Sequence, residues 1–319
     1  MLLSENQQLR KIAFYVRGIA EHYLYPSNHY RASLSKKLAL LSQYDHERIY
    51  RRVNYYNKLN EAFPVPDSAL PLSQVPHHKT TYLFDFRRII RYFPTHVRTT
   101  SRFGDVTDVT DFPRFVKTRP LQKPHDNSIL LRLNSIRHFR PITDTTPFHQ
   151  KKNSLVWRGK VKRDHRRDFF RKHFGNTLCN LGMTNKLDDK EMNSWKKPFL
   201  SIKEQLQHKF ILSIEGNDVA TNLKWIAQSN SLCFMTQPKY ESWFMEGTLK
   251  PGKHYVQLRD DYSDLTQKIE YYLTHTHEAE EIINNFKRFY IEFTDPKKEH
   301  LIGLLVAQKY LSLSGQLTE

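Results

Sequence analysis

Residues 208–227 read HKFILSIEGNDVATNLKWIA, and this stretch decides the class of fold. Its apolar run at 210–214 is typical of a short buried strand. The tetrapeptide EGND at 215–218 then leads into a helix, which Asn217 or Asp218 is expected to cap. The apolar side chains of that helix recur at the spacing of one helix face, at Val219, Leu223, Ile226 and Ala227. The stretch therefore predicts a strand, a turn and a helix in succession.

The same alternation extends over the second half of the chain. Further strands are predicted at 154–157, 231–236 and 254–258, and further helices at 265–273, at 279–293 and from Asp295-Pro296 onward. Strands that alternate with helices form parallel sheets wrapped by helices. The sequence therefore predicts an α/β protein.

The first half of the chain is organised differently. Helical spacing predicts an N-terminal helix with one apolar stripe that includes Leu9, Ile12, Val16 and Ile19. Four prolines between residues 64 and 76 interrupt the helical pattern, and short β-branched or aromatic runs follow. We therefore expect a helical region at 1–65, a first α/β lobe at 66–150, a second α/β lobe at 151–290 and a C-terminal helix at 291–319.

The composition indicates anionic partners. The 319 residues include 50 Lys and Arg against 33 Asp and Glu, a formal net charge of +17. This excess fits nucleic acid, phosphorylated small molecules or an acidic membrane surface. No signal-peptide core follows Met1, the apolar run at 302–307 is too short to span a bilayer, and Cys179 and Cys233 lack metal-ligand spacing. We expect a cytoplasmic protein with peripheral contact to the inner face of the membrane.

A first glycine turn follows the strand predicted at 154–157. Arg158-Gly159 lies in a segment, 151–174, that holds ten Lys or Arg, Lys162 among them, against two Asp. A glycine lets the backbone approach a phosphate closely, and the fork of an arginine suits phosphate oxygens. These residues therefore predict a phosphate site, although a solvated basic loop is the plainer interpretation.

A second glycine turn, Glu215-Gly216-Asn217, precedes the predicted helix. Free N–H groups at a helix start can receive a diphosphate, helped by the helix dipole. Lys224 would add a cation and Asn222 a hydrogen bond, and Glu215 suits the hydroxyl pair of a ribose or a sugar. An ordinary capped helix is the plainer interpretation. The chain contains no GxxxxGK[ST] and no GxGxxG motif, so neither a P-loop nor a dinucleotide site is predicted.

Three carboxylates lie in the segment FGDVTDVTDFP at 103–113. Asp105, Asp108 or Asp111 could serve as a general base that deprotonates a hydroxyl group. Aspartate before a proline turn is also common for structural reasons. The sixteen histidines form no HExxH motif and no other metal-ligand spacing, so we expect no metal ion.

At these residues the chain resembles glycosyltransferase family 90, which includes the protein O-glucosyltransferases and bacterial enzymes of the lipopolysaccharide type. The resemblance extends over about residues 105–290, and the bacterial branch is the most similar. The order and spacing of many motifs make it specific. The motifs are Trp157-Arg158-Gly159, Arg167-Asp168, HKFILSIEG at 208–216, TNLK at 221–224, PGKHYV at 251–256 and DYSDL at 261–265.

The resemblance implies a GT-B fold of two Rossmann-like lobes, here with extra N-terminal and C-terminal helices. It also implies a UDP-sugar as co-substrate, no further cofactor, inversion at the anomeric carbon and no obligatory metal. The base of the family is an Asp before an aromatic-Pro pair, which Asp111-Phe112-Pro113 matches, and Asp105 is its rival. The first hundred residues have no counterpart. The residues that the resemblance places near the donor diphosphate are Arg158, Gly159, Arg167, Gly216, Asn222 and Lys224, the last where the family usually has Arg.

The leading interpretation is an inverting glycosyltransferase that moves a hexose or pentose from a UDP-sugar to a hydroxyl of a lipopolysaccharide-core or other glycan. Basic N-terminal helices would hold it against anionic lipid. The alternative is a nucleic-acid-binding protein that uses the basic, aromatic-rich surface, with 17 Tyr and 20 Phe as stacking groups. No nucleic-acid module is recognised in the sequence, so we expect no nucleic-acid partner.

Overall fold

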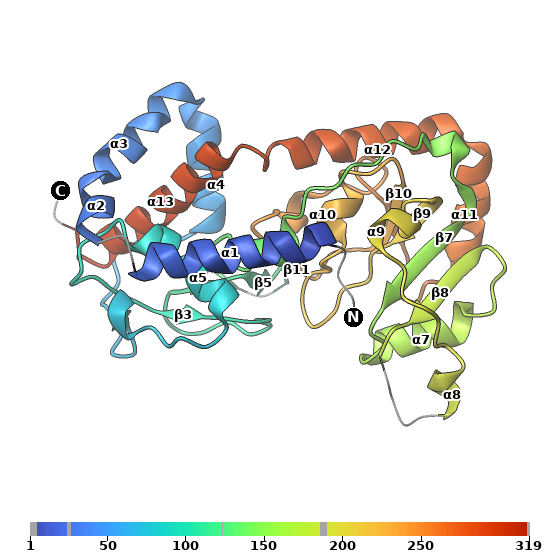
Figure 1. Ribbon diagram of the computed structural model, residues 1–319, viewed down its shortest axis with the longest axis horizontal. Helices are drawn as coiled ribbons and strands as arrows, with labels where there is room; N and C mark the ends of the chain where they lie inside the picture. Colours follow the sequence, from blue (N-terminus) through green and yellow to red (C-terminus); the bar gives the residue numbers. More distant parts are fainter. Residues whose placement is uncertain (1–4, 24–26, 123, 186–189, 318–319) are drawn as a thin grey trace. The chain divides into compact units, whose positions relative to one another are not determined.

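The computed structural model describes residues 5–23, 27–122, 124–185 and 190–317. The chain forms two compact units (Figure 1). Unit 1 comprises residues 1–138, 240–243 and 294–319, and unit 2 comprises residues 139–239 and 244–293. The expected mixed α/β class with parallel sheets is confirmed. The two-lobed GT-B arrangement and the four-part division of the chain stay predictions.

Unit 2 is built on a five-stranded parallel sheet with the strand order β12-β10-β9-β7-β8. All five side chains of β9 are buried, as expected for a strand that is covered on both faces. The strands predicted at 154–157, 210–214, 231–236 and 254–258 are confirmed with small shifts at their ends. The five strands are β7 (Lys152–Gly159), β8 (Cys179–Met183), β9 (His208–Leu212), β10 (Leu232–Thr236) and β12 (Val256–Leu258).

The helices of unit 2 share one apolar core with the sheet. Phe169 of α7, Ile269 of α11 and Ile282 of α12 belong to the same buried cluster as Trp157 and Phe210 of the strands. The long helices are α7 (Asp164–His173), α11 (Leu265–Thr274) and α12 (Thr276–Ile291). The shorter segments are α8 (Lys190–Asn193), α9 (Ile202–Gln205), α10 (Leu223–Ile226), η3 (Phe148–Gln150) and η4 (Glu246–Thr248).

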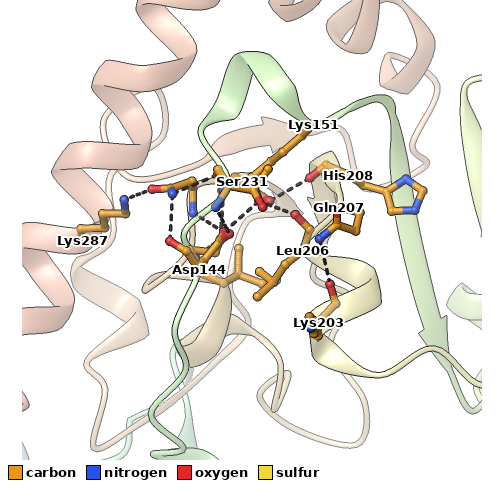
Figure 2. A network of polar contacts seen from close by, with 12 residues as sticks. Asp144, Lys151, Lys203, Leu206, Gln207, His208, Ser231 and Lys287 are labelled. Atoms are coloured by element: carbon orange, nitrogen blue, oxygen red, sulfur yellow. Dashed lines mark hydrogen bonds and ion pairs between the residues drawn. The ribbon is translucent and has the colours of Figure 1, made fainter.

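A buried polar network holds the starts of the strands of unit 2 (Figure 2). The ammonium of Lys151, directly before β7, lies 2.8 Å from a carboxylate oxygen of Asp144 and also donates to the carbonyl of Leu206, before β9. The same Asp144 carboxylate accepts from the backbone N–H of Asn230 at 2.7 Å, and Lys287 of α12 donates to the Asn230 side chain. The network ties the amino ends of β7, β9 and β10 together and leaves their carboxyl ends for other contacts.

Unit 1 combines helices with three small sheets. One sheet is parallel and three-stranded, with the order β3-β4-β6. The other two are antiparallel pairs, β1-β2 and β5-β11. Its strands are β1 (Leu70–Pro71), β2 (Arg98–Thr99), β3 (Ser101–Arg102), β4 (Arg114–Val116), β5 (Thr118–Pro120), β6 (Ser128–Leu130) and β11 (Tyr240–Ser242). Its helices are α1 (Glu5–Tyr23), α2 (Ser27–Ala32), α3 (Leu34–Leu38), α4 (His46–Tyr56), α5 (Thr80–Ile90), α6 (Ser135–His138) and α13 (Pro296–Leu313), with the short η1 (Ala39–Gln43) and η2 (Leu72–Gln74).

Buried ion pairs join the distant chain segments of unit 1. The guanidinium of Arg119 lies 2.7 Å from the carboxylate of Glu241, and both side chains are almost completely inaccessible. Arg52 of α4 pairs with Glu299 of α13 at 2.5 Å, and the Trp243 indole donates to the same carboxylate. These contacts fix β11 and α13 onto the N-terminal part of the chain. Among the described residues, no helix is long and apolar enough to cross a membrane.

Candidate functional site

The carboxyl edge of the unit 2 sheet brings the two glycine turns together. Strands β7 and β9 are parallel neighbours, with Leu155 opposite Phe210. Parallel neighbours end at the same edge of a sheet, and ligands of open α/β sheets bind beyond that edge. Gly159 is the last residue of β7 and Gly216 follows the end of β9, so both turns open onto one edge.

Arg166, in the first turn of α7, links the two turns directly. Its guanidinium donates to the carbonyls of Lys160 at 2.8 Å, Ile214 at 2.8 Å and Glu215 at 3.0 Å. It also lies over the Trp157 ring, 5.3 Å from the centroid, in the geometry of a cation–π contact. Burial lowers the pKa of Arg166 to about 10, so the side chain remains a cation at neutral pH. In the sequence only the basic run at 151–174 points to Arg166.

Two further side chains of the same loop reach the second turn. Arg163 donates to the side-chain oxygen of Asn217 at 2.6 Å, and a ring nitrogen of His165 lies 3.0 Å from the Glu215 carbonyl. Burial lowers the pKa of His165 from its usual value. The basic loop after β7 is therefore pinned onto the turn after β9 by several side chains. Part of the charge run that looked like a solvated loop is a structural link.

Gly159 and Gly216 differ in the space that is available for a side chain. A Cβ atom on Gly159 would lie 2.6 Å from the Trp157 ring, which is a severe clash. A Cβ atom on Gly216 would meet only the Arg166 guanidinium, at an ordinary 3.5 Å. Neither residue has a positive φ. Gly159 is thus required by the packing of a core side chain, whereas Gly216 keeps open space beside its backbone.

Arg158 forms its hydrogen bonds on the β8 side of the sheet. Its guanidinium donates to the backbone carbonyl of Asn180 at 2.7 Å, to the Asn180 side chain at 2.9 Å and to the Pro198 carbonyl at 3.1 Å. Burial lowers the pKa of Arg158 from its usual value. These hydrogen bonds hold Arg158 to β8 and to the segment that follows it. Its predicted role toward a diphosphate stays a prediction.

The prediction that a helix begins near Val219 is wrong. Residues 217–222 form bends and a turn, and α10 begins only at Leu223 and has four residues. The side chain of Asn222 donates to the Leu212 carbonyl at 2.9 Å, which binds this segment to the end of β9. The N–H of Gly216 donates to the Asp218 carbonyl at 2.9 Å and is not held open at a helix start. The helix start therefore lies at Leu223 and not at Val219, and the expected diphosphate site stays a prediction.

Lys224, which was expected to add a cation at the second turn, lies in the interior of this structure, and that role stays a prediction. Its side chain is completely buried, forms an ion pair with Glu246 and lies 5.5 Å from the centroid of the Phe244 ring. A buried cation needs such a partner, because an unpaired charge is strongly disfavoured in the interior. In this structure Lys224 braces α10 and does not face the surface at the turn.

The remaining predicted donor-side residues stay at the edge. Lys162 is exposed, and Arg167 donates to Asp164 at 3.1 Å while its Nε is buried without a partner in the described structure. The Glu215 carboxylate accepts from the backbone N–H of Lys239 at 3.1 Å. Five cations between residues 160 and 167 face a single acid, so the edge keeps a positive charge.

The three aspartates of unit 1 lie at different places on its parallel sheet. Strands β3 and β4 are parallel neighbours, so the segment 103–113 must run back from the carboxyl end of β3 to the amino end of β4. Asp105 lies near the carboxyl edge, where its carboxylate is 2.7 Å from the ammonium of Lys117, the residue after β4. Asp111 is exposed and lies just before β4, at the amino edge.

Asp108, between them, is held by two arginines. Arg102 and Arg114 lie 2.6 Å and 3.0 Å from its carboxylate. Partial burial tends to raise the pKa of Asp108, but the two guanidinium groups outweigh it and lower that pKa below its usual value. Asp108 is thus occupied by its ion pairs, and Asp105 and Asp111 lie at different edges of the sheet. In the described part of the chain, no three His, Cys, Asp or Glu side chains are grouped to hold a metal ion.

The chain is similar to known glycosyltransferases. A family model described as "Glycosyl transferase family 90" matches residues 133–298. The chain is 41% identical over 312 residues to O-glucosyltransferase LpsA of Dichelobacter nodosus, covering 97% of each. It is 29% identical over 180 residues to protein O-glucosyltransferase 2 of Danio rerio, which is 55% of this chain and 34% of that protein. Human protein O-glucosyltransferase 3 is 24% identical over 123 residues, 38% of this chain and 24% of that protein. These relatives lend no support to the nucleic-acid alternative.

The two glycines give a paired test of the site geometry. Gly159→Ala should lower the free energy of unfolding by about 1–3 kcal/mol, because its methyl group forces the Trp157 ring to move. Gly216→Ala should cost less than about 0.5 kcal/mol, since its Cβ has room. Urea denaturation followed by tryptophan fluorescence measures both. Equal losses in the two variants would contradict the different roles assigned to these glycines.

Proposed function

This chain belongs to glycosyl transferase family 90, and on that premise we propose that it is an inverting enzyme that moves a sugar from a UDP-sugar to a glycan hydroxyl. The names of its relatives favour glucose among the hexoses and pentoses. The observation that supports the proposal most is the convergence of the two turns through Arg166, because it concentrates cations at the edge where a nucleotide diphosphate would lie.

The donor would bind at the carboxyl edge of the unit 2 sheet. Lys162, Arg163 and Arg167 supply positive charge there, and Arg166 positions the turns that present it. Charge builds up on the diphosphate as the bond to the sugar breaks, so cations at this position stabilise the transition state more than the bound substrate. The Glu215 carboxylate would accept hydrogen bonds from ribose or sugar hydroxyls. In this proposal side-chain cations, and no obligatory metal ion, neutralise the leaving UDP.

The general base would come from unit 1. The family motif favours Asp111, whereas the sheet geometry favours Asp105, because Asp105 lies at the carboxyl edge beside Lys117. We place the base at Asp105 and keep Asp111 as the alternative. The carboxylate takes the proton of the acceptor hydroxyl, whose oxygen attacks the anomeric carbon as the bond to UDP breaks. Attack on the face opposite the leaving group inverts the configuration at that carbon.

The acceptor would be a lipopolysaccharide-core or related glycan at an anionic membrane surface, and α1 supports this part of the proposal. One face of α1 packs on α5, where the Phe14 and Phe84 ring centroids are 6.1 Å apart and Glu21 pairs with Arg88 at 3.1 Å. The opposite face presents the predicted apolar stripe to solvent. Its four large side chains are 50–63% exposed: Leu9, Ile12, Val16 and Ile19.

The charge of α1 favours a lipid surface over a second copy of the chain. Arg10 and Arg17 border the stripe in the helical pattern, and the Arg17 side chain, which pairs with Glu21, is 71% exposed. Apolar side chains bordered by cations are the pattern of helices that lie in the interface of anionic bilayers. A net charge of +17 opposes the approach of another copy. We therefore propose that the protein binds the inner, cytoplasmic face of the membrane peripherally through α1.

A first experiment tests the donor site. Arg166→Lys keeps the charge but loses the fork that joins the two turns, so the dissociation constant for UDP should rise about tenfold or more. Arg171→Lys, on the same helix and paired with Asp168, is the matched control and should bind UDP as the wild type does. Isothermal titration calorimetry with UDP measures both. Unchanged UDP affinity in Arg166→Lys would overturn the proposed donor site.

A second experiment decides between the two candidate bases. Asp105→Asn should lower the rate of UDP release from UDP-glucose about 10²–10⁴-fold with lipopolysaccharide-core oligosaccharide as acceptor. Asp111→Asn should stay within about threefold of the wild type, and both variants should keep their UDP affinity, because the donor site is in unit 2. Thermal unfolding checks that loss of the Lys117 partner has not unfolded the protein. Loss of turnover in Asp111→Asn alone would assign the base to Asp111.

A third experiment tests the membrane contact. Replacement of Ile12 and Val16 by Glu should lower the partition coefficient onto phosphatidylcholine vesicles with 40% phosphatidylglycerol about tenfold or more, because two exposed apolar side chains are lost. The matched control replaces Phe199 and Ile291, two exposed apolar residues elsewhere, by Glu. Vesicle co-sedimentation and size-exclusion chromatography measure binding and association. Equal loss in both double variants, or a dimer that only the α1 variant dissociates, would contradict membrane docking by α1.

A further inference from the structure

A cavity of about 490 Å³ lies within unit 1 along the outer strand of its parallel sheet. Its walls come from β1, β2 and β3, from the start of α5 and from the beginning of β4. Phe103 lines it at the carboxyl end of β3, two residues before Asp105. Phe112, the residue after Asp111, also lines the cavity. The cavity therefore begins close to both candidate bases.

The lining of the cavity is positively charged. Lys79, Arg102 and Arg114 line it together with His78, and no Asp or Glu is among the residues that line it. The two arginines share a single carboxylate, that of Asp108, at 2.6 Å and 3.0 Å. The ammonium of Lys79 donates to a neutral partner, the Phe103 carbonyl. Positive charge thus exceeds negative charge around the cavity, which favours an anionic ligand.

Two buried polar atoms in the lining lack a hydrogen-bond partner in the described structure. They are the Thr99 hydroxyl oxygen and Nε of Arg114, in side chains that are only 3% and 6% exposed. Buried polar groups in folded proteins are nearly always hydrogen-bonded, so these two atoms have bonding capacity for a ligand group or a bound water that reaches them from the cavity. A hydroxyl can bond the Thr99 oxygen, and an anionic oxygen can accept from Arg114.

Aromatic and strained groups complete the cavity. Phe103 and the partly exposed Phe112 offer apolar surface, as a pocket that orients a ligand by a few polar groups requires. Lys79 has a left-handed backbone, with φ of 53°, and Gly104 has φ of 118°. A Cβ on Gly104 would lie 2.6 Å from the Lys79 ammonium, so this glycine allows the lysine to reach its place. Backbone strain of this kind persists where the surrounding structure requires it, often at ligand sites.

We infer that this cavity is a subsite for an anionic sugar, a pyranose that carries a phosphate or a carboxylate. The apolar face of the ring packs against Phe112, a ring hydroxyl bonds the Thr99 oxygen, and the anionic group binds Arg102 and Arg114. The inference rests on the proposed function, in which unit 1 supplies the base that deprotonates the acceptor hydroxyl. It adds that the glycan recognised there carries a negative charge on a sugar close to the hydroxyl that is glycosylated.

Binding alone tests the subsite, without any need for turnover. Isothermal titration calorimetry of the full chain uses glucose 6-phosphate, glucuronate, glucose and inorganic phosphate as probes. At least one charged sugar should bind about tenfold more tightly than both glucose and phosphate, and the two charged sugars distinguish phosphate from carboxylate. Thr99→Val, which removes only the hydroxyl, and Arg102→Gln should each weaken that binding about tenfold. Arg51→Gln, an exposed arginine of α4 outside the cavity, should not.

The outcomes separate this inference from the proposed function. Inorganic phosphate that binds as tightly as the phosphorylated sugar would show an anion site only and would overturn the sugar subsite. Equal binding of glucose and the charged sugars, or no effect of Thr99→Val and Arg102→Gln, would also overturn it. UDP titrated into the same variants reports on the donor site in unit 2, so a failure of the proposed function appears there and not in the sugar titrations.

Discussion

The parallel pairing of β7 with β9 is the constraint on which the candidate site depends. Because of this pairing the chain leaves both strands at the same edge of the sheet. The basic loop after β7 and the turn after β9 are therefore neighbours in space. Arg166 uses this proximity by binding carbonyls from both segments. A different strand order would separate the segments that the charge run and the glycine turn place together.

Much of unit 2 can be predicted from the sequence because its strands are fully buried apolar runs separated by helical patterns. The run at 210–214 and those around it specify β7, β9, β10 and β12 by composition alone. The helix expected from Val219 fails because apolar residues in an irregular buried segment have the same spacing as a helix face. Here the Asn222 side chain replaces helical hydrogen bonds with a bond to the end of β9.

Only some of the residues of the candidate site can be predicted from the sequence. Arg166 binds backbone carbonyls, which leave no residue-specific signal, so the sequence pointed to the basic run but not to this arginine. The requirement for Gly159 comes from the direction of the Trp157 ring, which no spacing rule contains. The placement of Asp105 and Asp111 at opposite edges follows from the direction of β3 and β4, strands of two and three residues that are too short to give a periodic pattern.

Unit 1 is assembled from three stretches that are far apart in the chain, with Glu241, Trp243 and Glu299 as the contacts between them. During synthesis on the ribosome, the first 138 residues emerge long before the strand and helix that complete their core. In the sequence, almost all of unit 2 comes between those stretches. Unit 2 can therefore fold before the last segment of unit 1 has been synthesised. Until then Arg52 and Arg119 lack their carboxylate partners and the apolar core of unit 1 is incomplete, so the nascent chain exposes apolar surface of the kind that chaperones bind.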